Sequence, residues 1–185
     1  MKSAGNLPDT ITFAGNGEPT LHPHFKGIIE DTVVLRNQIA SGAKITVLSN
    51  ATMVHLKDVF EALKLADNNV LKLDAGTEEM YRLINRGPQK LPLEQIVENL
   101  MKFAGKLTVQ TLFLKGKVDG ILIDNTTESE VHAWLGHLQR IKPELLMIYP
   151  IARATPASGL EKIEKKILQK IAYQAEGLGI KTEVF

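Results

Sequence analysis

The chain has 185 residues, of which 44% are hydrophobic and 23% are charged, the composition of a globular domain with one core. Lys and Arg total 22 against 21 Asp and Glu, so no broad basic surface is expected and a nucleic-acid partner is unsupported. No apolar run approaches the roughly 20 residues that span a bilayer, and the amino terminus lacks the apolar core of a secretion signal. We expect a cytoplasmic protein without a membrane partner. Cys is absent, which excludes disulfides, thiolate nucleophiles and Cys-ligated metals within this chain.

Short β-rich runs alternate with longer segments of helical period along the chain. The predicted strands cover residues 10–14, 44–49, 69–74, 107–114, 145–151 and 180–184. Repeated strand, helix and strand order predicts right-handed crossovers and a parallel sheet covered by helices. The periodicity leaves open whether this α/β sheet is doubly wound or forms an arc of a (β/α) barrel. No linker divides the chain, so we expect one domain over residues 1–185.

Apolar side chains at helical spacing predict amphipathic helices between these strands. They lie in the ranges 25–33, 56–63, 93–100, 131–138 and 163–175. Thr127 and Glu130 fit a capping box at the start of the fourth of these helices. Gly177 is expected to end the last one.

Glycines and polar side chains gather at or near the ends of the predicted strands. In GNGEPT, Gly15 and Gly17 lack Cβ, so the backbone can adopt positive φ and approach a ligand, while Pro19 stiffens the exit of the loop. Lys72 and Asp74 are two residues apart and therefore share one strand face. Further polar candidates are Asn50, Gln110 and Arg153. Because the carboxyl ends of parallel strands meet at one edge, a ligand site is expected there.

Several of these segments together resemble one family. GNGEPTLHP resembles the GGEP motif of radical S-adenosylmethionine (radical SAM) proteins, and LSNAT resembles the TNGT-type loop after a later strand of that superfamily. KLDAGTEEMYRLINR resembles the next strand and loop, and IYPIARATP is similar to the IYTIDRPTP stretch of a group of iron–sulfur oxidoreductases. The resemblance covers nearly the whole chain. It implies a partial (β/α) barrel of about five to six parallel strands with helices outside.

The resemblance also identifies what this chain lacks. Radical SAM proteins hold a [4Fe–4S] cluster through a CxxxCxxC loop after their first strand, whereas this chain has no Cys and only nine residues before its first predicted strand. We therefore expect the first βα unit to be missing and the chain to be the carboxyl-terminal bulk of a longer protein. The full-length protein would cleave S-adenosylmethionine reductively to a 5′-deoxyadenosyl radical that abstracts hydrogen from an unknown substrate. The chain alone would be inactive.

By this resemblance, the chain carries cofactor-binding residues but neither a catalytic residue nor a metal ligand. The loop that would cradle the methionine end comprises Gly15, Asn16, Gly17, Glu18 and Pro19. The side chains that would face the ribose or the methionine carboxylate are Asn50, Lys72, Asp74 and Gln110. Arg153 would meet the adenine side or a substrate anion. The implied cofactors are S-adenosylmethionine and, in the full-length protein only, the [4Fe–4S] cluster.

The resemblance leaves the substrate and partners open. A glycyl-radical enzyme is one candidate substrate, and a flavodoxin or ferredoxin is the implied reductant. The missing first strand would expose one edge of the sheet, which predicts self-association.

Other interpretations of the same residues remain open. The chain could be a noncatalytic scaffold or ligand-binding α/β domain, or a phosphate-binding domain, although the GxxxxGK[ST] spacing is absent. Glu18 could simply brace its turn. His22 and His24 lack a third ligand at metal-binding spacing, so a helix start and a surface ring are expected instead.

Overall fold

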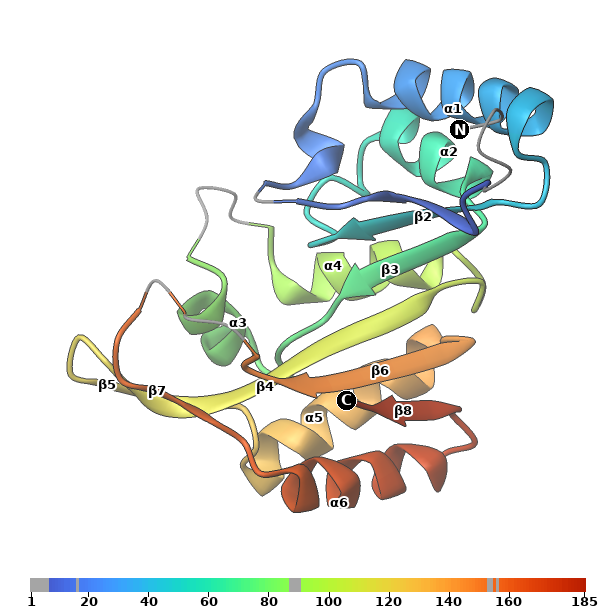
Figure 1. Cartoon of the computed structure of the whole chain (residues 1–185). Coiled ribbons are helices and arrows are strands. Elements are labelled where there is room, and N and C mark those ends of the chain that lie inside the picture. Colours follow the sequence, from blue (N-terminus) through green and yellow to red (C-terminus); the bar gives the residue numbers. More distant parts are fainter. Residues whose placement is uncertain (1–6, 16, 87–90, 153–154, 156) are drawn as a thin grey trace. The chain divides into compact units, whose positions relative to one another are not determined.

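The computed structural model describes residues 7–15, 17–86, 91–152, 155 and 157–185. The chain forms two compact units, residues 1–71 and residues 72–185. In Figure 1 the colour runs along the sequence from blue at the amino terminus to red at the carboxyl terminus. The expectation of one domain over residues 1–185 stays a prediction.

Unit 1 contains the first two strands and all but the last residue of the third, in parallel pairs. They are β1 (Thr10–Phe13), β2 (Lys44–Ser49) and β3 (Asn68–Lys72), with β2 between the other two. The helices of this unit are the 3₁₀ turn η2 (Pro19–Leu21), α1 (Phe25–Ile39) and α2 (Lys57–Leu65), and α1 and α2 lie side by side (Figure 1). Ile45 and Val47 of β2 are fully buried, and Phe25 and Ile29 of α1 are buried as well. The apolar stripe predicted for α1 therefore contributes to the core.

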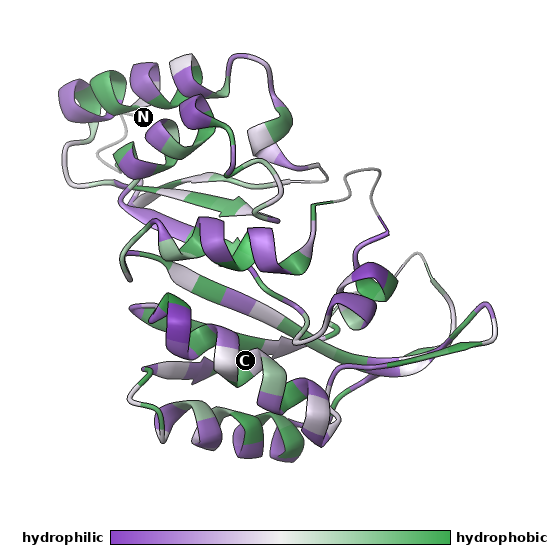
Figure 2. Ribbon diagram, turned by 180° about the vertical axis from the view of Figure 1, so that it is seen from behind, coloured by the Kyte–Doolittle hydropathy of each residue, from purple (hydrophilic) through white to green (hydrophobic). Residues whose placement is uncertain are grey.

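Unit 2 contains a second set of parallel strands. They are β4 (Thr108–Val118), β6 (Leu145–Pro150) and β8 (Thr182–Val184), with β6 between the other two. Its helices are α3 (Glu78–Ile84), α4 (Leu93–Met101), α5 (Glu128–Ile141) and α6 (Lys165–Glu176). Figure 2 shows hydrophobic and hydrophilic residues alternating along α6, whose Leu168 and Ala175 are fully buried. Gly177 is the residue that ends α6, as predicted.

An antiparallel ribbon extends β4 beyond its predicted end. The second half of β4 pairs antiparallel with β5 (Ile121–Asp124) and β7 (Leu160–Lys162), neither of which the sequence pattern predicted. Gly116 makes this pairing possible: its φ is +146°, and a Cβ there would lie 2.1 Å from the carbonyl oxygen of Gly159. Only glycine allows this close backbone approach. This part of β4 is therefore the central strand of the ribbon, between β5 and β7.

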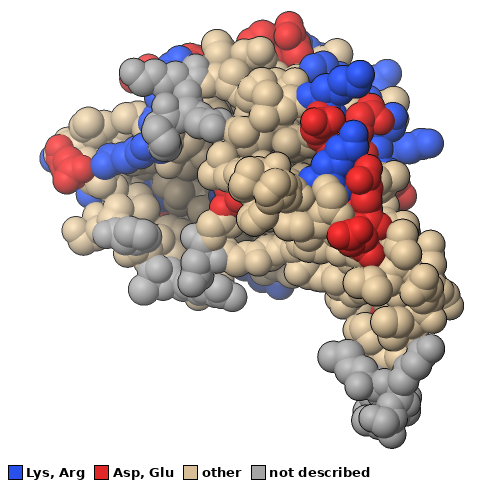
Figure 3. Space-filling view, turned by 90° about the horizontal axis from the view of Figure 1, so that it is seen from above, with Lys and Arg blue, Asp and Glu red and all other residues tan. Residues whose placement is uncertain are grey.

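Parallel strands joined through helices confirm the predicted α/β fold class. Helix α3 was not predicted, because residues 78–84 were assigned to a loop. On the face seen in Figure 3, Lys and Arg lie beside Asp and Glu and form no single-sign patch. None of the helices that the structure describes combines the length and apolar composition needed to cross a bilayer.

Candidate functional site

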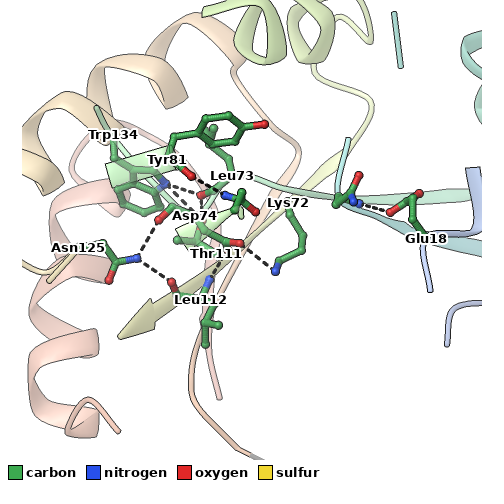
Figure 4. A network of polar contacts seen from close by, with 11 residues as sticks. Glu18, Lys72, Leu73, Asp74, Tyr81, Thr111, Leu112, Asn125 and Trp134 are labelled. Atoms are coloured by element: carbon green, nitrogen blue, oxygen red, sulfur yellow. Dashed lines mark hydrogen bonds and ion pairs between the residues drawn. The ribbon is translucent and has the colours of Figure 1, made fainter. Parts of the chain in front are cut away.

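The loop after β1 is held to the loop after β2 by the carboxylate of Glu18. One carboxylate oxygen accepts hydrogen bonds from the backbone N–H and the hydroxyl of Thr20, at 3.1 and 2.5 Å. The other oxygen accepts the N–H of Asn50 at 2.7 Å, a contact drawn in Figure 4. Glu18 also precedes Pro19, the first residue of η2, and caps that turn. Glu18 therefore organises both loops, one of the two roles that the sequence left open.

The loop after β2 adopts a tight turn at Asn50. The side-chain oxygen of Asn50 accepts the N–H and hydroxyl of Thr52 at 3.0 and 2.7 Å, and the Ser49 hydroxyl accepts the N–H of Ala51 at 3.1 Å. Ala51 is fully buried and has a φ of +64°, in the left-handed region that favours glycine. This is the position at which the TNGT-type loop carries glycine.

Gly15 and Gly17 differ from the sequence expectation in backbone conformation. Both are exposed, and neither has positive φ. A Cβ added at either position would have no atom within 4 Å. No turn or internal contact of the described residues therefore requires glycine here. The bare backbone faces open space, which is what a loop that contacts a ligand through its N–H and C=O groups needs.

In unit 2, Lys72 and Asp74 meet in an ion pair. The ammonium of Lys72 lies 2.8 Å from one oxygen of the Asp74 carboxylate, in agreement with their two-residue spacing. The Asp74 side chain is 1% exposed, whereas that of Lys72 is 32% exposed. The other Asp74 oxygen accepts the N–H of Leu112 in β4 at 2.8 Å. Within the described part of the chain, the buried carboxylate is thus stabilised by one cation and one backbone donor.

A buried polar network surrounds this ion pair (Figure 4). The side-chain amide of Asn125 donates to the carbonyl oxygens of Asp74 and Leu112, both at 2.8 Å. The hydroxyl of Thr111 donates to the carbonyl of Leu73 at 2.9 Å, and the indole N–H of Trp134 approaches the same carbonyl at 3.2 Å. Sequence reasoning missed these three side chains. Thr111 is a polar residue on the apolar face of β4, and this was the sequence feature that could have indicated the buried network.

Helix α5 fixes the loop that follows Asp74. Glu130 accepts the N–H groups of Gly76 and Thr77 at 2.9 and 3.2 Å and also the Thr77 hydroxyl. The capping box was predicted half correctly. The Thr127 hydroxyl accepts the N–H of Glu130 at 3.3 Å, but the Glu130 carboxylate binds the distant loop. A Cβ at Gly76 would lie 2.2 Å from the carbonyl oxygen of Glu130, so the helix packs against bare backbone.

The other predicted residues are placed as follows. Gln110 is half-buried in β4, and its carbonyl accepts the N–H of Leu73 at 3.0 Å. Asn16 and Arg153 lie outside the described residues. His22 and His24 are exposed, and a ring nitrogen of His22 accepts the N–H of His24 at 3.1 Å. Among the described residues, no group of three or more His, Cys, Asp or Glu could hold a metal ion.

Two tyrosines respond to the environment around Asp74. Burial raises the pKa of Tyr149, and the Asp74 charge raises it further. Burial likewise raises the pKa of Tyr81, with added contributions from Glu78 and Asp74. Both phenols therefore stay neutral at physiological pH and can serve as hydrogen-bond donors.

Unit 2 contains a cavity beside Lys72. It measures about 330 Å³ and is lined mainly by aliphatic side chains of α3 and the β4, β5 and β7 ribbon. A larger hollow of about 1200 Å³ is bounded by α5 and α6 and is lined by both charge signs, including Glu128 and Lys170. The smaller cavity is the one next to the Lys72–Asp74 pair.

Comparison with curated proteins finds relatives of greater length. The chain is 34% identical over 152 residues to the UPF0026 protein slr1464 of Synechocystis sp., covering 80% of the chain and 52% of that protein. It is 30% identical over 115 residues to a UPF0026 protein of Helicobacter pylori, covering 60% and 36%. It is 24% identical over 166 residues to a protein named GTPase Obg of Brachyspira hyodysenteriae, covering 88% of the chain and 23% of that protein. The chain thus spans about half or less of these relatives. No protein-family model matches it.

Solved structures share the fold of the whole chain. A domain of the pyruvate-formate lyase-activating enzyme from Bacteroides vulgatus matches with a TM-score of 0.68 and 18% identity, covering 95% of this chain and 98% of that one. A radical SAM methyltransferase from Sphaerobacter thermophilus matches with a TM-score of 0.71 and 14% identity, covering 100% of this chain and 52% of that one. The likeness shows that this chain shares their partial (β/α) barrel fold. At these sequence identities, the likeness shows the fold alone and not the activity.

Proposed function

We propose that this chain is the S-adenosylmethionine-binding part of a radical SAM iron–sulfur oxidoreductase. The observation that carries the proposal is the GNGEP loop. Glu18 ties it to Asn50, and its two exposed glycines face open space that the described residues leave unfilled. The fold shared with radical SAM enzymes supports the same conclusion.

Each unit, taken by itself, offers polar groups of the kind that bind the polar ends of S-adenosylmethionine. Exposed N–H and C=O groups of the GNGEP loop would take the amino and carboxylate groups of the methionine portion. Within unit 1, Asn50 would take the ribose hydroxyls or the carboxylate. Within unit 2, Gln110 and the Lys72–Asp74 pair would take the same groups. The resemblance assigns the adenine side or a substrate anion to Arg153, which lies outside the described residues. S-adenosylmethionine, when bound beside a reduced iron–sulfur cluster, supplies radical hydrogen-abstraction chemistry. The residues of this chain would bind and orient the cofactor.

The [4Fe–4S] cluster does not fit this chain, because its usual ligands are Cys and the chain has none. The proposal therefore assigns the cluster ligands to a segment outside these 185 residues, and the isolated chain would be inactive. The relatives, of which the chain covers 52% or less, leave length for such a segment.

The substrate and partners form the finer part of the proposal. The structural neighbour from Bacteroides vulgatus is a domain of a pyruvate-formate lyase-activating enzyme, which favours a glycyl-radical enzyme as partner. The reductant would be a flavodoxin or ferredoxin, and the location cytoplasmic. The chain alone is also proposed to self-associate through β1. Among the described strands, β1 pairs with β2, and its other edge would be the one that binds a second copy.

The test uses the complete gene product and the 185-residue chain in parallel. Both are treated anaerobically with iron, sulfide and reductant, and 5′-deoxyadenosine formation from S-adenosylmethionine is measured. We expect product from the complete protein and none from the chain. A complete protein with a spectroscopically verified cluster that forms no 5′-deoxyadenosine would refute the enzymatic part.

A further inference from the structure

The cavity beside Lys72 has the size and lining of a site for a small, largely apolar ligand. Its volume of about 330 Å³ is near the lower end of the roughly 300–1,000 Å³ typical of ligand pockets. Its aliphatic walls include Leu83 of α3, Leu112 and Leu114 of β4, and Leu160 of β7.

The walls of the cavity belong to a cluster with its own packing. Leu114, Val118 and Ile123 are buried together, and Leu83 and Leu160 pack against them while remaining partly accessible. The ribbon that the sequence did not predict therefore supplies much of this surface. Leu114 is further anchored because its N–H donates to Asn125 at 2.8 Å. The cavity is thus built on hydrogen-bonded strands on one side and on α3 on the other.

The described residues place charges of one sign at the cavity. Among the described lining residues, the ionisable side chains are those of Lys72 and Arg86, both cations. Their carboxylate partners, Asp74 at 2.8 Å and Asp119 at 2.9 Å, do not line the cavity. An anionic group in the cavity would therefore share these two cations with Asp74 and Asp119, while neither carboxylate would face it from the lining. This arrangement favours an anionic end on the ligand and disfavours a cationic one.

We propose that this cavity binds a small carboxylate whose apolar body contacts the aliphatic walls and whose anionic end meets Lys72 and Arg86. That this ligand is the substrate of the enzyme rests on the proposed function. The binding itself does not, because it needs neither S-adenosylmethionine nor a cluster.

The first experiment tests charge selection with three probes of one shape. Binding of 3-phenylpropionate, 3-phenylpropanamide and 3-phenylpropylamine to the complete gene product is measured by ligand-observed NMR and calorimetry, without cofactor. We expect the carboxylate to bind about tenfold more tightly than the amide, because charge-assisted hydrogen bonds contribute more than neutral ones. The amine should bind more weakly still. Equal affinity for all three probes, or no binding of the carboxylate to the folded protein, would overturn the proposal.

The second experiment locates the site with matched variants. Leu160→Trp fills the cavity and should abolish carboxylate binding, whereas Leu122→Trp changes an exposed residue that does not line it and should leave binding unchanged. Arg86→Gln should weaken binding several-fold. Arg82→Gln, at a similarly exposed arginine outside the cavity, should not. Equal binding by the members of either pair would refute the location. Formation of 5′-deoxyadenosine, measured separately, distinguishes failure of this site from failure of the proposed function.

Discussion

The Lys72–Asp74 ion pair offers a quantitative test of the network beside the cavity. The perturbation is a double-mutant cycle with Lys72→Met and Asp74→Asn. Asn can still accept the N–H of Leu112, so Asp74→Asn chiefly removes the charge. Among the described residues, Lys72→Met leaves the Asp74 carboxylate, whose side chain is 1% exposed, with the Leu112 N–H as its hydrogen-bond donor.

The size of the coupling follows from this burial. Removing one partner of a fully buried pair costs about 3–5 kcal/mol, whereas an exposed pair contributes about 0.2–1 kcal/mol. Water reaches Lys72, which is 32% exposed, so an intermediate value applies. We expect each single variant to lose about 2 kcal/mol and the coupling free energy to be about 1–2 kcal/mol.

The assay is urea unfolding followed by tryptophan fluorescence. Trp134 is the single Trp of the chain, is 2% exposed and donates to the carbonyl of Leu73, next to Asp74. The control is the exposed pair Lys115–Glu161 of the same unit, at 3.6 Å, with an expected coupling below about 0.5 kcal/mol. A Lys72–Asp74 coupling no larger than that of the control would refute the reasoning.

Three further predictions concern unit 1. Gly17→Ala should leave the free energy of unfolding unchanged or slightly raised, since a Cβ there has no atom within 4 Å. The same variant should weaken S-adenosylmethionine binding to the complete protein at least several-fold, as measured by calorimetry. Gly27→Ala, equally open, should leave the affinity unchanged, and equal affinities would exclude the loop as a ligand contact. Ala51→Gly should change the free energy of unfolding by less than about 1 kcal/mol, because relief of the left-handed strain offsets the lost methyl group. Ala51→Val should lower the free energy of unfolding by more than about 2 kcal/mol. Similar values for the two variants would contradict the strain argument. Burial raises the pKa of Asp67, but the Ile45 N–H and two nearby cations outweigh it and hold the pKa below its ordinary 3.8. The stability from the ionised Asp67 is therefore present above about pH 4 and lost as pH falls through the lowered pKa. The difference in free energy of unfolding between the unmodified protein and Asp67→Asn should shrink on acidification. A difference that stays constant with pH would be evidence against this role of Asp67.

The local pattern of the sequence was sufficient for the parallel strands and most helices. In the buried strand β2, Ile45 and Val47 lie on one face. This alternation with a period of two residues can be recognised from neighbouring residues alone. The same holds for Lys72 and Asp74, whose contact depends on a spacing of two residues. The GNGEP loop was likewise recognisable, because its glycines stand directly behind a strand.

Long-range contacts decided what the pattern could not. Glu130 fits a capping box by its neighbours, yet its carboxylate binds Thr77, 53 residues away in the sequence. Gly116 was not singled out from the sequence, because the contact that requires glycine there is with the distant backbone of Gly159 and Leu160.

The sequence by itself determined the α/β order, the amphipathic helices and the loops that resemble a cofactor cradle, because these depend on residues a few positions apart. Only the tertiary structure decided that Glu18 joins two loops and that Asn125 and Thr111 lie beside Asp74. It also decided that the ribbon and α3 together line a cavity with Lys72 and Arg86. Hydrogen-bond partners of buried polar groups are chosen by which segments the fold brings together, and that choice leaves no periodic trace in the chain.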